Sequence, residues 1–213
     1  MKLRITTLVL ISIMLGQIYS QKVTETFLSN GNVYVQYGKE YFHQITKLKL
    51  DSLPILSRNH KYLIYLRKRQ QQEIYLTQII RYDLNTSTEK TLIQSAEDHP
   101  EVSTPISYAD SRDYPFSCLG GIENIKLSPD NERIYFETSA WVVAGAVHYY
   151  DISTGKIYFF HSGSLNKIYP NGTVSIQMTD IATDKKGNSG RYWQDWLYDK
   201  NGVKIKALSK KQY

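Results

Sequence analysis

One pattern, a Tyr-Asp pair followed by a polar turn and a strand-forming run, occurs three times in this 213-residue chain. It reads YDLNTSTEKTLI from Tyr82, YDISTGKIYFF from Tyr150 and YDKNGVKIKAL from Tyr198. An aspartate that closes a strand can accept hydrogen bonds from the amides of the next turn, which Gly155 and Gly202 help to reverse. The tyrosine, one position earlier, points to the opposite face and suits packing against an adjacent sheet. The pattern predicts a structural turn used repeatedly.

A hairpin with a polar turn precedes each Tyr-Asp pair. Its turn residue, Asn59, Asp130 or Asn171, lies 23, 20 or 27 residues before the tyrosine of its unit. Each unit therefore reads as four antiparallel strands in about 40–50 residues, which is the size of one propeller blade. The three units fall at about 45–94, 121–160 and 161–208.

The rest of the chain has the same character. Aromatic and β-branched runs such as NVYVQY, YLIYL and EIYLTQIIRY alternate with turn sequences such as SNGN, SPDNE and YPNGT. In RIYFET, Ile134 and Phe136 face one way while Tyr135 and Glu137 face the other. No stretch after residue 20 keeps a 3.6-residue period. We therefore predict one all-β domain over residues 21–213.

The segment IKLSPDNERIYFETSAWVVAGAVHYYDISTGKIYFF resembles one blade of the TolB-like and WD-type β-propellers. The matching features are Ser128-Pro129-Asp130, Ile134-Tyr135-Phe136, Tyr150-Asp151 and Thr154-Gly155-Lys156. Part of it, TSAWVVAGAVHYYDISTGK, also resembles a group of exported bacterial proteins. The resemblance covers 121–160 well and 45–94 and 161–208 more faintly. It implies a scaffold, and one scaffold can serve many functions.

Three units and a partial unit at 23–44 are fewer than the 4–8 blades that propellers usually have. We therefore predict a small or incomplete β-propeller. A fourth blade built from residues 23–44 and an added strand would close it. An open stack of sheets, a dimer and an irregular β-sandwich remain as alternatives.

The first twenty residues have the pattern of a secretory signal peptide. Lys2 and Arg4 precede an apolar run from Ile5 to Leu15, which is shorter than the roughly 20 residues needed to cross a bilayer. We expect cleavage near Ser20 and a secreted or periplasmic protein that is not integral to the membrane. The alternative is an uncleaved membrane anchor.

The charge of the chain bears on its binding partners, and its cysteine content bears on disulfide formation. Without Lys2 and Arg4 the chain keeps 24 Lys and Arg against 20 Asp and Glu, a mild and well-mixed excess. That balance concerns solubility more than function, and export makes nucleic acid an unexpected partner. Cys118 is the only cysteine, so no internal disulfide can form.

The segment 95–121 interrupts the repeat. It contains three of the six prolines and Cys118. Because proline disfavours strand interiors, we expect a long ordered loop, of the kind that often carries function. The candidate binding residues in it are Tyr108, Asp110, Arg112 and Tyr114. The alternative is a loop that only covers a sheet edge.

A second candidate binding surface is GRYWQDWLYD, with Arg191, Trp193 and Asp195. In a strand, Trp193 and Asp195 share one face and Trp196 lies on the other, so one tryptophan belongs to the core. Flat rings beside carboxylate groups could bind a carbohydrate or a peptide. The alternative is packing between sheets.

No catalytic residue, metal site or cofactor is predicted. The five histidines have no metal-ligand spacing, and His148 in GAVHYY reads as a core residue. The sequence also has no G-x-S-x-G elbow. We expect an exported, non-catalytic protein that binds a protein or an envelope component. A hydrolase or lyase acting on glycans near Trp193 and Asp195 is the alternative, and structural assembly through open sheet edges is a third.

Overall fold

The computed structural model describes residues 22–39, 41–96, 99–106, 119–141, 144–183 and 189–211. Within these ranges the regular elements are strands, with one exception, the short 3-10 turn η1 (Pro100–Val102). The strands are β1 (Val23–Ser29), β2 (Asn32–Tyr37), β3 (Tyr41–Gln44), β4 (Asp51–Leu56), β5 (Tyr62–Gln71), β6 (Ile74–Asp83), β7 (Thr88–Ala96), β8 (Ile122–Leu127), β9 (Arg133–Trp141), β10 (Ala144–Asp151), β11 (Lys156–Ser162), β12 (Ser164–Ile168), β13 (Val174–Thr183), β14 (Ser189–Tyr198) and β15 (Lys204–Lys211). No helix of the described ranges has both the length and the apolar character needed to span a membrane.

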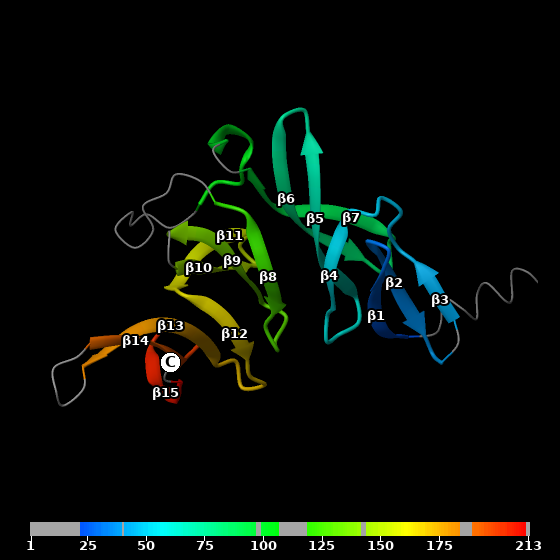
Figure 1. Cartoon of the computed structure of the whole chain (residues 1–213). Coiled ribbons are helices and arrows are strands. Elements are labelled where there is room, and N and C mark those ends of the chain that lie inside the picture. Colours follow the sequence, from blue (N-terminus) through cyan, green and yellow to red (C-terminus); the bar gives the residue numbers. More distant parts are fainter. Residues whose placement is uncertain are drawn as a thin grey trace, which may run out of the picture.

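The strands form four antiparallel meanders in chain order. The N-terminal sheet is β1–β2–β3, the second sheet is β4–β5–β6–β7, the third sheet is β8–β9–β10–β11 and the C-terminal sheet is β12–β13–β14–β15. Figure 1 shows them following one another along an arc, with the N-terminal and C-terminal sheets at its two ends. The predicted all-β fold of four-stranded antiparallel units is confirmed. The four sheets follow one another in a row and do not form the two layers of a single sandwich.

Each pair of successive sheets buries its own apolar cluster. The cluster between the N-terminal and second sheets includes Val33 and Tyr82, the next includes Ile64 and Tyr150, and the last includes Val147 and Tyr198. In every unit the tyrosine of the Tyr-Asp pair therefore faces the preceding sheet. Each sheet presents one face to its predecessor and the other to its successor, since side chains alternate along a strand.

The aspartates of the Tyr-Asp pairs organise the turns that follow them. Asp83 accepts hydrogen bonds from the amides of Asn85 and Thr86, and Asp151 from those of Ser153 and Thr154. The Thr86 amide, chiefly, holds the pKa of Asp83 below its ordinary value.

Asp199 acts in the same way, because it accepts from the amides of Asn201 and Val203. The three aspartates are thus occupied by their own turns, which is why the pattern repeats in the sequence.

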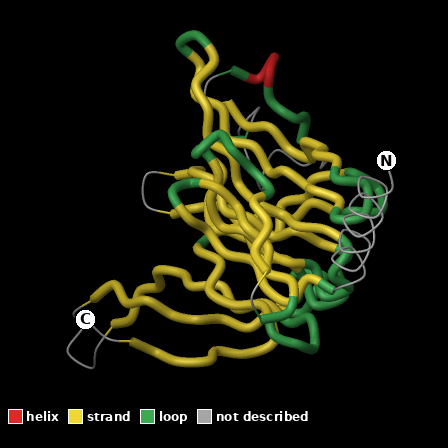
Figure 2. The backbone as a smooth tube through the Cα atoms, turned by 90° about the vertical axis from the view of Figure 1, so that its right-hand side faces the viewer, coloured by secondary structure: helices red, strands yellow, loops and turns green. Residues whose placement is uncertain are grey.

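The first turn of each unit is built alike. The side-chain oxygens of Asn59, Asp130 and Asn171 each accept from the amide two residues later. In a meander, the first and third turns lie at the same end of the sheet. Figure 2 shows many of the turns gathered along one side of the molecule.

Hydrogen bonds across these turns connect successive sheets. The amide of Arg58 donates to Asn131 Oδ1 at 2.9 Å between the second and third sheets. The guanidinium of Arg133 donates to the carbonyl of Lys200 between the third and C-terminal sheets. Hydrogen bonds between the turns and apolar contacts between the sheet faces therefore hold successive sheets in the same relative positions.

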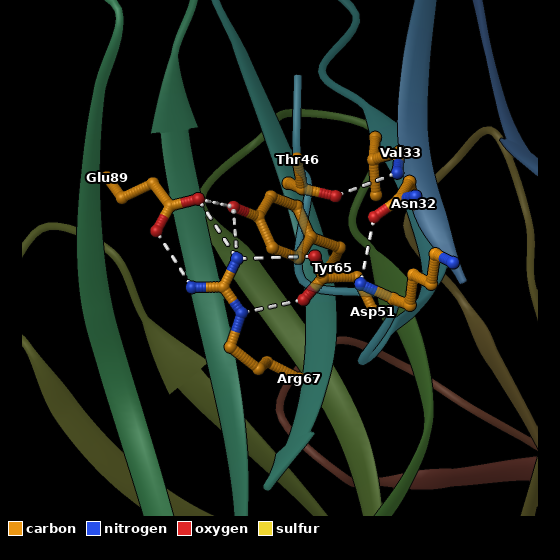
Figure 3. Close-up of polar contacts among 8 residues, drawn as sticks. Asn32, Val33, Thr46, Asp51, Tyr65, Arg67 and Glu89 are labelled. Atoms are coloured by element: carbon orange, nitrogen blue, oxygen red, sulfur yellow. Dashed lines mark hydrogen bonds and ion pairs between the residues drawn. The ribbon is translucent and has the colours of Figure 1, made fainter. Parts of the chain in front are cut away.

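A buried ion network stiffens the second sheet near the N-terminal sheet (Figure 3). Arg67 Nε donates to Asp51 Oδ1 at 2.7 Å, and its Nη1 donates to Glu89 Oε2 at 2.8 Å. The Tyr65 hydroxyl also donates to Glu89. These residues come from β4, β5 and β7, so one guanidinium joins three of the four strands.

The part of the inserted segment that is described runs beside β7. The amide of Thr104 donates to the carbonyl of Gln94, and the amide of Gln94 donates back to Thr104 Oγ1. Ile106 then packs against the third sheet, next to Ala146 and Phe159. The segment therefore passes from the edge of the second sheet onto the third.

Candidate binding faces

The C-terminal sheet has one face against its neighbour and one that no other described sheet covers. Leu165, Val174, Ile176 and Tyr198 pack against the third sheet. The strand register assigns the alternate residues to the opposite face, which we call the C-terminal face. Its members are Lys167, Ser175, Gln177, Thr179, Ile181, Arg191, Trp193, Asp195, Leu197 and Lys206.

All three binding residues predicted in this part of the sequence lie on the C-terminal face. Arg191, Trp193 and Asp195 occupy alternate positions of β14. Across the strand pair, Trp193 lies opposite Thr179 and Asp195 lies opposite Gln177. The structure therefore brings an exposed cation, a half-buried indole and a carboxylate into one row.

One hydrogen bond of this row joins β13 to β14. Gln177 Nε2 donates to Asp195 Oδ1 at 3.3 Å. Arg191 is exposed, and Ile181, its neighbour across the strands, is 64 % exposed. The row is thus a mixed polar and apolar surface on an open sheet.

The two-residue period of β14 separates its two tryptophans. Trp196 packs against the cluster shared with the third sheet, and Lys204 Nζ lies 3.2 Å from the centre of its ring. Trp193 points the other way. Trp196 is therefore the tryptophan that belongs to the core.

Ser175 marks the centre of the C-terminal face. It lies between Lys167 and Leu197 in the register of the sheet and is fully buried. Its hydroxyl has no hydrogen-bond partner among the described residues. A buried hydroxyl without a partner is unfavourable by about 1–3 kcal/mol.

The N-terminal sheet has a corresponding face that no other described sheet covers, and the sequence patterns did not indicate it as a site. Val33 and Val35 pack towards the second sheet, so the alternate residues point away from it. We call this surface the N-terminal face. Its members are Glu25, Phe27, Tyr34, Gln36, Phe42 and Gln44.

Three aromatic rings dominate the N-terminal face. Phe27 and Tyr34 stack with 5.3 Å between ring centres, and Phe42 meets Phe27 edge-on at 5.5 Å. Phe42 is 52 % exposed. The alternation of valine and tyrosine in NVYVQY indicates two different faces of the strand. Which of the two faces is covered depends on the position of the second sheet.

The other predicted binding residues, Tyr108, Asp110, Arg112 and Tyr114, lie outside the described residues, as does Cys118.

Within the described ranges, no group of three or more His, Cys, Asp or Glu residues is placed to hold a metal ion. His148 is buried between strands, with its Nε2 2.9 Å from Thr138 Oγ1 and its ring stacked on Phe136. Burial lowers the pKa of His148 to about 3, so the imidazole is neutral at physiological pH.

Comparison with known proteins supports the fold. No family model matches the sequence, and no curated protein matches it either. Among solved structures, the chain is similar to the β-propeller domain of the Trilobed protease from Pyrococcus furiosus, which has an open velcro topology. The two share 10 % identity with a TM-score of 0.53, over 87 % of this chain and 52 % of that one. The chain thus has the fold of a small or incomplete β-propeller, as its blade-like repeats predicted.

Two further structures give lower scores. A putative TolB from Agrobacterium tumefaciens shares 15 % identity with a TM-score of 0.49, over 84 % of this chain and 56 % of that one. A gluconolactonase from Xanthomonas campestris shares 9 % identity with a TM-score of 0.30, over 84 % of this chain and 70 % of that one. The chain spans about half the length of the protease propeller and of the TolB protein.

Proposed function

We propose that this chain is an exported, non-catalytic propeller protein that binds a protein partner through its C-terminal face. The observation that supports the proposal is the gathering of Arg191, Trp193 and Asp195 on the one face of the C-terminal sheet that no other described sheet covers.

The composition of this face suits a protein partner. Tryptophan and arginine are the residues that most often dominate the binding energy of protein interfaces. The ring of Trp193 offers apolar area, while Arg191 and Asp195 offer charges of both signs within the same row. The face lies on an open sheet, which fits a broad partner surface better than a small molecule.

The glycan hydrolase or lyase is the weaker alternative. A glycosidase needs a second carboxyl group at about 5–10 Å from the first. Asp195 is the one acid among the described members of the C-terminal face named above.

Export forms part of the same proposal. The positive start and short apolar run of residues 1–20 support a signal peptide cleaved near Ser20 and a secreted or periplasmic location. Mass spectrometry of the protein recovered from its native compartment tests this. An N-terminus at Gln21 is expected, and an intact Met1 on exported protein would contradict it.

The binding proposal is tested by capture of partners from envelope extracts on immobilised protein. We expect Trp193→Ser to lower the recovery of specific proteins at least about tenfold. Tyr75→Ser is the matched control, because Tyr75 is 72 % exposed at the β5–β6 hairpin, on the second sheet. Equal recovery by wild type and both variants would reject the C-terminal face as the binding surface.

A further inference from the structure

The two ends of the arc expose complementary halves of one kind of interface. In each of the three internal interfaces, the successor-facing side of one sheet meets the predecessor-facing side of the next, which carries the Tyr-Asp tyrosine. The N-terminal face is a predecessor-facing side without a predecessor among the described sheets. The C-terminal face is a successor-facing side without a successor among them.

We infer that the partner of the C-terminal face is the N-terminal face of a second copy of this chain. Two copies would then form a closed ring with two identical head-to-tail contacts. The inference rests on the proposed function, because it names the partner of the same face.

The residues of the two faces support this pairing. The N-terminal face presents Phe27, Tyr34 and Phe42 together with one acid, Glu25. The C-terminal face presents Trp193 and Arg191, and aromatic faces attract both rings and guanidinium groups.

The charges of the two faces are also complementary. Lys167, Arg191 and Lys206 give the C-terminal face three cations against one acid, Asp195. The strand positions that make up the N-terminal face include Glu25 and no cation. Two copies of the same face would place like charges opposite each other, so the pairing of a C-terminal face with an N-terminal face is favoured over the pairing of two identical faces.

The size of the chain agrees with a ring of two. The chain aligns with 52 % of the protease propeller, so two copies supply about the length of one such propeller. A head-to-tail contact gives a closed ring when its rotation closes, and an open filament when it does not. The arc in Figure 1 curves in one direction, as the sheets of a propeller do.

Sedimentation of the purified protein tests the inference. We expect a concentration-dependent dimer whose Kd rises at least about tenfold in Phe27→Ser/Phe42→Ser and again in Trp193→Ser. Arg191→Ser, a change at an exposed position, should weaken the dimer less and without any loss of folding. Tyr75→Ser is the control and should leave the Kd unchanged.

Mixing the variants separates the possible arrangements. The N-terminal-face variant and the Trp193→Ser variant retain one intact contact between them, so a mixture should form mixed dimers more readily than either variant alone. A dimer that pairs two copies of the same face would instead be sensitive to variants of only that face, which would overturn the pairing.

The remaining outcomes are also decisive. A monomer at all concentrations, or an assembly larger than two, would overturn the ring. If the protein is monomeric but Trp193→Ser still loses partners from extracts, the second-copy inference fails and the proposed binding function stands. If neither measurement responds to Trp193→Ser, both fail.

Discussion

Carboxylates at two different sheet junctions have hydrogen-bond donors of different kinds. Near the N-terminal sheet, Glu89 and Asp51 share the guanidinium of Arg67. Between the third and C-terminal sheets, Glu137 Oε1 accepts from the amide of Leu165 and the side-chain amide of Asn124, each at 2.5 Å. The first junction balances charge with charge, while the second surrounds a carboxylate with neutral donors.

The difference shows in the pKa values of the two glutamates. Hydrogen bonds from the Arg67 guanidinium hold the pKa of Glu89 below its ordinary value. Burial raises the pKa of Glu137, although its hydrogen bonds oppose the shift. A cation within hydrogen-bond distance thus decides whether a half-buried carboxylate stabilises or destabilises its junction when it is ionised.

The largest test removes the cation. Arg67→Met should lower the free energy of unfolding by about 3–5 kcal/mol, because Asp51 would remain as a buried charge without its counter-ion. Urea unfolding followed by circular dichroism measures the loss. Lys68→Met is the matched control on the adjacent, exposed position of β5, and it should change stability by less than about 0.5 kcal/mol. Equal losses in the two variants would show that the network adds nothing to the sheet.

The next test separates the charge of Glu137 from its hydrogen bonds. Glu137→Ala should cost about 1–3 kcal/mol at pH 7, because the amides of Leu165 and Asn124 would lose their acceptor. Glu137→Gln keeps an acceptor oxygen and removes the buried charge. We therefore expect the glutamine variant to be at least as stable as wild type at pH 7 in the same urea measurement. A glutamine variant as unstable as the alanine variant would mean that the charge itself holds the junction.

Acid should act on the two junctions with opposite signs. Glu89 has a lower pKa in the folded protein than in the unfolded chain, where the pKa is near 4.5. Ionised Glu89 therefore stabilises the fold above pH 4.5, and this stability is lost as the pH falls through the pKa of the folded state. Glu137 has a higher pKa in the folded protein than in the unfolded chain. Protonated Glu137 therefore stabilises the fold below about pH 4.5, and this stability is lost as the pH rises through the pKa of the folded state. We therefore expect the advantage of wild type over Glu89→Gln to shrink from pH 7 to pH 3.

Over the same interval, the advantage of Glu137→Gln over wild type should shrink as well. Each effect should stay below about 1 kcal/mol, since both carboxylates keep part of their hydration. Urea unfolding at several pH values measures both differences. Advantages that do not change with pH would contradict the opposed shifts.

The local parts of the fold could be predicted from the sequence, and the contacts between distant segments could not. Asp151 and its turn lie within four residues, so the pattern itself states the hydrogen bonds. Arg67 meets Glu89 across 22 residues, and Asn124 meets Leu165 across 41. Those pairs depend on which strands become neighbours, and alternation along one strand does not specify that.

The candidate binding faces could likewise be predicted only as far as the alternation along single strands allows. The two-residue period correctly placed Trp193 and Asp195 on one face of β14. It did not say that Trp196 faces the third sheet, because that depends on the order of the sheets. The rings of Phe27, Tyr34 and Phe42 were missed as a surface for the same reason, since each lies on a different strand of the N-terminal sheet.

Ser175 differs from both carboxylate junctions, because its buried hydroxyl has neither a charged nor a neutral hydrogen-bond partner among the described residues. Its hydroxyl is buried on the C-terminal face without a partner among the described residues. Ser175→Ala should therefore raise the free energy of unfolding by about 1 kcal/mol in the same urea measurement, since the alanine has no hydroxyl to desolvate. Thr179→Ala, at an exposed position of the same strand face, is the control and should have little effect. A loss of stability in Ser175→Ala would instead mean that the hydroxyl is hydrogen-bonded in the folded protein, and the C-terminal face would then resemble the satisfied junction of Glu137.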